Sequence, residues 1–277
     1  MKPFVIQGEP EVVTNIRKEI LEKFKDLEFV ESTHQYFLPQ ENGIKTELPS
    51  VSHVTHQFAI PFETELEAEK YAAKHGETKE YWMDQWRYKS LKATTNGTIV
   101  HEFAENCFYT KYKLYDLITP KMRDRFVEDK KWLIPIQPKE EAAKQFWLNF
   151  PENVYPVLAE TKVYTKKYAG TFDLLCYFKH PVDDSKSGLL IMDWKTNSTL
   201  TKSYSRTKGK MLLEPFTDYF DEPKSLYTLQ LSAYQVPLED MGYKIIGRRL
   251  MHLKDDGTYD LIPLNDETKK LREALEL

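Results

Sequence analysis

Cysteine is scarce in this sequence, and long apolar runs are absent. Only Cys107 and Cys176 occur among the 277 residues. Two thiols cannot by themselves supply a zinc site or an iron–sulfur cluster, and they suit a reducing compartment better than a disulfide scaffold. No uncharged apolar segment approaches the roughly 18 residues of a membrane helix, and Glu9 and Glu11 come too early for a signal peptide. We therefore expect a soluble, cytoplasmic chain without a membrane partner.

Two classes of catalytic motif are also missing. The sequence contains no G-x-x-x-x-G-K-[ST] phosphate loop, which excludes a helicase motor in this chain. It contains no G-x-S-x-G element and no grouping of Ser or Cys with His that indicates acyl transfer. The 39 basic and 43 acidic side chains leave a net charge of 39 − 43 = −4, which argues against non-specific coating of nucleic acid. An acidic balance is still compatible with carboxylates that bind a metal.

Apolar side chains are abundant enough for a packed core, at 41% hydrophobic and 13% aromatic residues. Helical spacing predicts helices over 10–25, 63–75, 78–92, 98–112, 138–149, 224–240 and 266–276. Strand patterns predict strands over 28–38, 44–48, 157–165, 171–178, 188–195, 243–253 and 258–263. Turn-forming and irregular sequence predicts loops with a short helix over 114–137 and a mobile loop over 202–210.

This order of elements predicts one α/β domain over 1–277. We expect residues 1–150 to form a mostly helical elaboration with a β-hairpin near 28–48. Residues 151–277 are expected to form the α/β core, with a central mixed sheet flanked by helices.

Charged side chains end the apolar strand 188–195, which reads GLLIMDWK. Side chains two residues apart on a strand share a face, so Asp193 and Lys195 face one site while Trp194 faces the core. An acid and an amine at the end of a buried strand are costly unless they bind something. Taken alone, however, a D-x-K pattern is more often a simple ion pair at a strand end.

Asp173 changes this balance. It follows a turn in the segment GTFD, and a hairpin or neighbouring strand would bring it beside Asp193. Two carboxylates that close repel each other unless a proton or a cation lies between them. Mg²⁺ and Mn²⁺ suit such hard oxygen ligands, and Lys195 would then stabilise charge that develops beside the ion. The alternative is that Asp173 only caps a turn.

Further motifs occur in a fixed order around this core. They are L-P-S-V-S at 48–52, G-T-x-x-H at 97–101, Glu160 on the strand before GTFD, D-x-K at 193–195 and Q-x-x-x-Y at 230–234. In this order they resemble the PD-(D/E)XK nuclease superfamily, and more closely its RecB-like exonuclease branch, which includes phage-encoded exonucleases. The resemblance spans residues 28–250. It implies a restriction-endonuclease-like core, and the two cysteines exclude the members of the branch that carry an iron–sulfur cluster.

The resemblance also implies a centre for Mg²⁺ or Mn²⁺. The implied metal ligands are His101, Asp173, Asp193 and the backbone carbonyl of Trp194. The implied catalytic side chains are Lys195, Asp193, Asp173 and Glu160. Glu105, one helical turn after the histidine, and Thr196, directly after the lysine, would stand beside them. A packed histidine on a helix face, an ordinary exposed acid at 105 and a structural role for Glu160 remain open alternatives.

Two segments are candidates for DNA contacts. Gln230 and Tyr234 share one face of a helix, where the amide could bond a phosphate or orient Lys195 and the phenol could stack on a base. The alternative is an amphipathic core helix. In the loop 202–210, Tyr204, Arg206 and Lys208 could guide a single strand, and a solvated loop is the equal alternative.

These expectations combine into a metal-dependent DNA exonuclease that hydrolyses phosphodiester bonds at DNA ends or in single strands, in DNA recombination, repair or replication. The alternatives are a sequence- or structure-specific endonuclease of the same superfamily and a non-catalytic DNA-binding accessory module of recombination. The resemblance also makes a helicase, an annealing protein or a single-strand-binding protein a candidate partner.

Overall fold

The computed structural model describes residues 4–31, 33–40, 43–118 and 137–277. Its centre is a five-stranded sheet in the order β4-β5-β6-β7-β8. The strands are β4 (Val154–Tyr164), β5 (Ala169–Phe178), β6 (Gly188–Lys195), β7 (Ile245–Leu253) and β8 (Tyr259–Pro263). Only β6 and β7 pair in parallel, because helix α8 (Pro223–Glu239) lies between them in the chain; the other neighbours are antiparallel. The predicted mixed sheet is confirmed.

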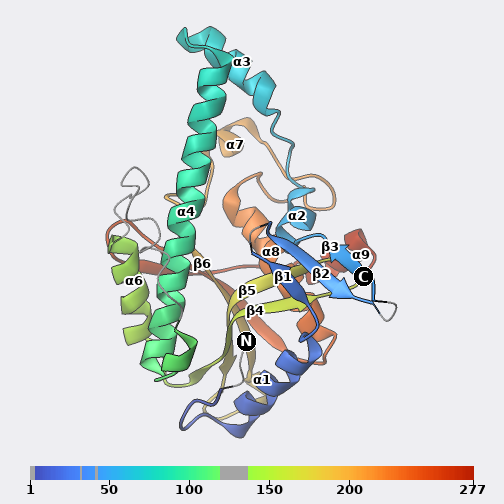
Figure 1. Cartoon of the computed structure of the whole chain (residues 1–277), viewed down its shortest axis with the longest axis vertical. Coiled ribbons are helices and arrows are strands. Elements are labelled where there is room, and N and C mark those ends of the chain that lie inside the picture. Colours follow the sequence, from blue (N-terminus) through green and yellow to red (C-terminus); the bar gives the residue numbers. More distant parts are fainter. Residues whose placement is uncertain (1–3, 32, 41–42, 119–136) are drawn as a thin grey trace.

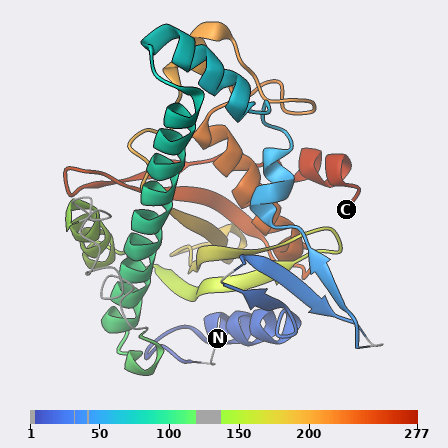
Figure 2. The same ribbon diagram turned by 45° about the horizontal axis from the view of Figure 1, so that its top comes forward.

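Helices cover both faces of this sheet (Figures 1 and 2). One core contains apolar residues of α1 (Glu11–Lys23), α2 (Val51–His56), α8 and α9 (Thr268–Leu275). The other contains residues of α4 (Lys79–Lys111) and α6 (Gln137–Leu148). β6 contributes to both cores, with Ile191 in the first and Trp194 in the second. The nearly continuous apolar run of this strand follows from burial on its two faces.

A small antiparallel sheet lies beside the large one. Its strands are β1 (Glu28–Val30), β2 (Gln35–Pro39) and β3 (Lys45–Leu48). The predicted strand 28–38 is therefore wrong as a single element, because the chain turns between β1 and β2, where His34 has a φ of +56°. The sheet is joined to β5 by the contact of Tyr36 Oη with Thr171 Oγ1 and by the Ala169 amide, which donates to the carbonyl of Pro49.

Helix α4 is longer than the sequence suggests. The predicted helices 78–92 and 98–112 form one continuous helix of 33 residues that passes through Gly97. A glycine inside a helix costs only about 1 kcal/mol relative to alanine, and packing against the sheet outweighs that cost. The first half of α4 extends beyond the sheet, where α3 (Thr64–His75) packs back along it (Figure 1). Gly76, with a φ of +78°, ends α3, which agrees with the predicted helix over 63–75.

Other segments differ less from the predictions. The mobile loop predicted over 202–210 contains a short helix, α7 (Ser203–Lys208), which ends at Gly209 with a φ of +61°. The described residues also include the 3-10 turns η1 (Tyr115–Leu117) and η3 (Asp184–Lys186). The rest of the irregular segment predicted over 114–137, residues 119–136, lies outside the described residues. Within the described ranges, none of the helices is long and apolar enough to cross a membrane.

Candidate metal centre and active site

Three acidic side chains lie side by side on neighbouring strands of the large sheet. Glu160 is on β4, Asp173 on β5 and Asp193 on β6. The pairs Ala159–Leu174 and Leu174–Met192 are in register, so the next position along each strand brings Glu160 opposite Asp173 and Asp173 opposite Asp193. The predicted proximity of Asp173 and Asp193 therefore follows from the strand register, and Glu160 extends their row by one strand.

Helix α4 adds a histidine to this row. His101 Nδ1 lies 3.5 Å from Asp173 Oδ2. One potential ligand atom each of His101, Glu160 and Asp173 lies within 4.8 Å of the other two. A nitrogen and two carboxylate oxygens at such separations fit the donor set of a divalent cation. These three residues could therefore hold a metal ion, whereas Asp193 lies outside this set.

The protonation equilibria of the site fit a ligand set. Burial raises the pKa of Asp173 well above its usual value, and the neighbouring Asp193 adds to the shift. Burial and the negative charge of Asp173 likewise raise the pKa of Glu160. Burial and the positive charge of Lys195 lower the pKa of His101 to about 4. The imidazole is therefore neutral at pH 7, the form that binds metals, while the carboxylates need a proton or a cation between them.

Lys195 lies at the end of β6 between an acid and an aromatic ring. Its ammonium forms an ion pair with Asp193 Oδ2 and lies 4.2 Å from the centre of the Tyr227 ring on α8. Burial lowers the pKa of Lys195, but the charges of Asp193 and Asp173 outweigh burial and raise it overall. The side chain is therefore charged at neutral pH. Asp193 Oδ2 is buried, and the Lys195 ammonium is its partner among the described residues.

The backbone of Trp194 also belongs to the site. Its amide donates a 2.6 Å hydrogen bond to Asp173 Oδ2, and its backbone is hydrogen-bonded to the His101 ring. The indole points into the core on the other side, 4.9 Å from the Phe146 ring. Because that core fixes the end of β6, it also fixes the positions of the two side chains that flank Trp194.

The backbone at Glu160 has an unusual conformation for a strand. Its φ is +43°, in the left-handed region that residues other than glycine seldom adopt. This conformation costs about 1–2 kcal/mol for an L-residue. Strained residues of this kind concentrate at binding and catalytic sites. The conformation interrupts the regular pairing of β4 at the point where Glu160 joins the acidic row.

Glu105 and Thr196 lie at the edges of the site. Glu105 accepts a hydrogen bond from Tyr109, and burial raises its pKa. Its charge contributes to the raised pKa of Glu160, so the two carboxylates lie near each other. The carbonyl of Thr196 accepts a 2.8 Å hydrogen bond from Lys139, and its Oγ1 lies close to Gly97 of α4. Thr196 thus contacts the helix that carries the histidine.

The Q-x-x-x-Y pair lies on α8 with its two side chains bonded to each other. Gln230 Nε2 donates a 3.1 Å hydrogen bond to Tyr234 Oη. Tyr234 is only 4% exposed and packs in the core against Phe172. The core-helix alternative therefore describes Tyr234, whose ring is not available for stacking in this conformation. Burial, followed by the charge of Asp193, raises the pKa of its hydroxyl group.

The three α7 residues predicted to contact DNA differ in their availability. Tyr204 is 61% exposed, and the ammonium of Lys210 lies 5.0 Å from the centre of its ring. Lys208 is also exposed. Arg206 is instead bound to the carboxylate of Glu222 through two hydrogen bonds of 2.9 and 2.7 Å. The positive charge of Arg206 is therefore largely offset, which the sequence alone did not indicate.

Sequence reasoning missed two residues at the site. Tyr227 contacts Lys195, and its position one turn before Gln230 on the same helix was the signal that could have identified it. Tyr36 of the small sheet is 3% exposed, and the charge of Glu160 contributes to its raised pKa after burial. No local pattern marks Tyr36, because its proximity depends on the packing of two sheets.

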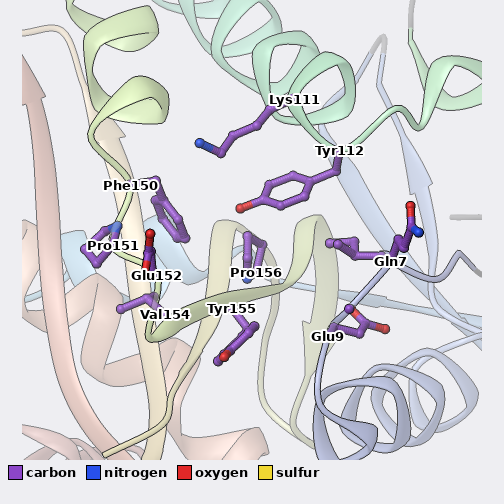
Figure 3. A pocket seen from close by; sticks show the side chains of 12 residues that line it. Gln7, Glu9, Lys111, Tyr112, Phe150, Pro151, Glu152, Val154, Tyr155 and Pro156 are labelled. Atoms are coloured by element: carbon purple, nitrogen blue, oxygen red, sulfur yellow. The ribbon is translucent and has the colours of Figure 1, made fainter. Parts of the chain in front are cut away.

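A pocket of about 220 Å³ lies elsewhere, between the N-terminal segment, the end of α4 and the start of β4. Figure 3 shows the Tyr112 hydroxyl group and the Phe150 ring facing its interior, with Pro156 at its base. The Lys111 ammonium above them is hydrogen-bonded to the carbonyl of Trp147. None of the acidic row lines this pocket, so it is separate from the candidate metal centre.

Comparison with models of known protein families gives no match for this chain, and comparison with curated proteins gives none either. The likeness to the nuclease superfamily therefore stays an expectation that rests on the motifs and on the geometry described above.

Proposed function

We propose that this protein is a metal-dependent nuclease that hydrolyses phosphodiester bonds of DNA at ends or in single strands. The observation that carries the proposal is the row of Glu160, Asp173 and Asp193 on three adjacent strands, with His101 on one side and Lys195 at its end. A purely structural arrangement would not gather three acids beside one ammonium, because like charges in a buried site are costly.

The metal would be held by His101, Asp173 and Glu160, while Asp193 lies next to this set and is paired with the Lys195 ammonium. Mg²⁺ and Mn²⁺ are the cations that this mixed oxygen and nitrogen set favours. Such an ion supplies a nucleophile at neutral pH and Lewis-acid stabilisation of the phosphate oxygens.

The side chains of the protein have separate tasks in this mechanism. The Lys195 ammonium orients the attacking water and stabilises the negative charge that develops on the phosphate. Asp193 keeps that ammonium charged and in place through their ion pair. His101 remains a neutral donor because its pKa is about 4. The Trp194 amide fixes the orientation of Asp173 through its hydrogen bond.

The α7 segment supports a nucleic acid as the substrate. Tyr204 presents an exposed ring with the Lys210 ammonium against it, and Lys208 is exposed one turn further along. An aromatic ring beside positive charges is the combination that binds bases and phosphates of single strands. The net charge of −4 gives no general attraction to duplex DNA. We therefore expect binding to depend on metal and on free ends or unpaired strands.

The test is degradation of end-labelled single- and double-stranded DNA and of a closed circular plasmid, each with Mg²⁺, Mn²⁺ or EDTA. We expect digestion of the linear substrates only with metal, and an intact plasmid. Removing the charge-stabilising amine in Lys195→Ala, or the ligand in Asp173→Asn, should lower kcat by about 10²–10³-fold. Lys186→Ala and Asp184→Asn make the same changes at exposed positions of η3 and should leave the rate unchanged.

Each other outcome has a definite meaning. Full metal-dependent cleavage by Lys195→Ala would overturn the proposed mechanism. Nicking of the plasmid would identify an endonuclease, and DNA binding without hydrolysis would identify a non-catalytic module. Weak activity that rises on addition of a helicase, an annealing protein or a single-strand-binding protein would identify a processing subunit.

A further inference from the structure

The Lys195 side chain is held from two directions by residues that the D-x-K pattern does not include. On one side is the carboxylate of Asp193. On the other is the ring of Tyr227, whose centre lies 4.2 Å from the ammonium. This distance is well within the range of about 6 Å over which a cation is attracted to the face of an aromatic ring.

Tyr227 is itself fixed by the chain that follows the lysine. Its hydroxyl group donates a 2.9 Å hydrogen bond to Asn197 Oδ1, two residues after Lys195. The backbone carbonyl of Asn197 is in turn 2.7 Å from Nε2 of His252, the β7 residue paired with Lys195. The ring is therefore attached to α8 by its backbone and to the end of β6 by its hydroxyl group.

Gln230 does not occupy this place. The sequence made it the candidate for orienting the lysine, but its amide is bonded to the Tyr234 hydroxyl group. Tyr227 lies one turn earlier on the same helix and makes the contact instead.

We propose that Tyr227 is a positioning residue for Lys195, with the ring face holding the ammonium in its working place and Asn197 holding the ring. This inference rests on the proposed nuclease function for its catalytic consequence, but the contact itself can be tested without activity. A lysine side chain has a flexible four-carbon stem, so its ion pair with Asp193 fixes only one direction of approach. The ring supplies the second direction and keeps the ammonium from turning toward solvent.

The variants separate the ring from its hydroxyl group. Tyr227→Phe keeps the face of the ring and removes the bond to Asn197, whereas Tyr227→Leu removes the ring. A desolvated cation–ring contact corresponds to about a ten- to thirty-fold change in an equilibrium or rate. We expect Tyr227→Leu to lower kcat by this factor with KM changed less than about threefold, and Tyr227→Phe to retain most of the rate. Tyr243→Leu is the matched control, because it removes a partly buried tyrosine that is bonded to Glu19, far from the site.

A spectroscopic measurement tests the contact directly. The measurement is NMR of the lysine Hε protons in metal-free protein labelled with ¹³Cε-lysine. Protons that lie over the face of an aromatic ring are shifted upfield by the ring current. We expect the Lys195 signal, assigned by its loss in Lys195→Arg, upfield of that of the exposed Lys186. The shift should persist in Tyr227→Phe and in Tyr243→Leu and disappear in Tyr227→Leu.

These measurements distinguish failure of this inference from failure of the proposed function. An inactive wild-type protein refutes the nuclease proposal, while the upfield signal still decides whether Tyr227 holds Lys195. Absence of that signal in the wild-type protein overturns the inference. It is also overturned if Tyr227→Leu loses the signal and keeps the wild-type kcat. Two further results would overturn it. One is a Tyr227→Leu variant with a raised KM and an unchanged kcat, which would make the ring a DNA contact. The other is a Tyr227→Phe variant whose kcat falls as much as that of Tyr227→Leu.

Discussion

Substitution of Gly170 tests how closely the helices pack against β5, the strand that carries Asp173. It lies at the start of β5, three residues before Asp173, where α2 and α8 both approach the strand. A Cβ atom at this position would lie 2.7 Å from Tyr234 Cε1 and 2.8 Å from Val51 Cγ2. The glycine is therefore required by close approach and not by its own backbone conformation.

The cost of Gly170→Ala can be worked out from these distances. Carbon atoms in contact normally lie about 3.5–4.0 Å apart, so both neighbours must move by about 0.7 Å or more. Neither can do so freely, because Tyr234 is 4% exposed and Val51 is 1% exposed. Overpacking of this kind destabilises the folded state by about 1–3 kcal/mol. The alanine also reduces the conformational freedom of the unfolded chain, which stabilises the folded state by about 0.4–1 kcal/mol. We expect a net loss of about 1–2 kcal/mol in the free energy of unfolding.

The same substitution at Gly97 supplies the control. Gly97 lies inside α4, and an added Cβ would meet only Thr196 Oγ1, at an ordinary contact distance of 3.5 Å. Gly97→Ala should therefore stabilise the protein by up to about 1 kcal/mol through helix propensity. Urea unfolding followed by tryptophan fluorescence, with unchanged m-values, measures both changes. A neutral or stabilising Gly170→Ala, or shifts of the same sign for both variants, would refute the packing argument.

Two further predictions concern buried charge. Because the folded state raises the pKa of Glu160 and of Asp173, the stability that these groups contribute is present below their unfolded pKa of about 4 and is lost as pH rises through the folded values. In EDTA the unfolding temperature should therefore fall as pH rises. Addition of Mn²⁺, or the substitution Asp173→Asn, should make this fall smaller. A wild-type profile in EDTA that is as flat as the profile with Mn²⁺ would contradict the prediction. Arg17→Met leaves Glu9 buried without its partner and should cost about 3–5 kcal/mol in urea unfolding. Adding Glu9→Gln should recover part of this loss, and a double variant less stable than Arg17→Met would show that the charge is not the cause.

The central strands could be predicted because their signals are local. The run GLLIMDWK is apolar over its first five residues and ends in two charged side chains around a tryptophan. Burial on both faces accounts for the run, and alternation accounts for the opposite directions of Trp194 and its neighbours. The segment GTFD is expected beside this strand because a hairpin or neighbouring-strand arrangement would bring Asp173 next to Asp193. The positions of Asp173, Asp193 and Lys195 followed from these patterns.

Features that depend on distant packing could not be predicted in the same way. The interruption expected near Gly97 does not occur, because α4 gains its stability from the sheet and not from local propensity. The left-handed conformation of Glu160 has no signal in the sequence, since glutamate seldom adopts it. The ion pair that offsets the positive charge of Arg206 joins α7 to Glu222, which lies 16 residues further along the chain. A loop rich in basic residues therefore contributes less free positive charge than its composition suggests.

The balance of charge in the acidic row bears on how many cations the site can accept. Ionised Glu160, Asp173 and Asp193 carry −3, and Lys195 contributes +1, while His101 is neutral at pH 7 because its pKa is about 4. The sum of −3 + 1 = −2 is the charge that one divalent cation neutralises. A second divalent cation would leave the row with an excess of +2, which is as unfavourable in a buried site as the uncompensated acids are. Negative charge from outside the row, such as a DNA phosphate, would therefore have to accompany a second ion. If the proposed metal centre exists, this balance predicts that the free protein binds one divalent cation and that a second ion enters only together with the DNA.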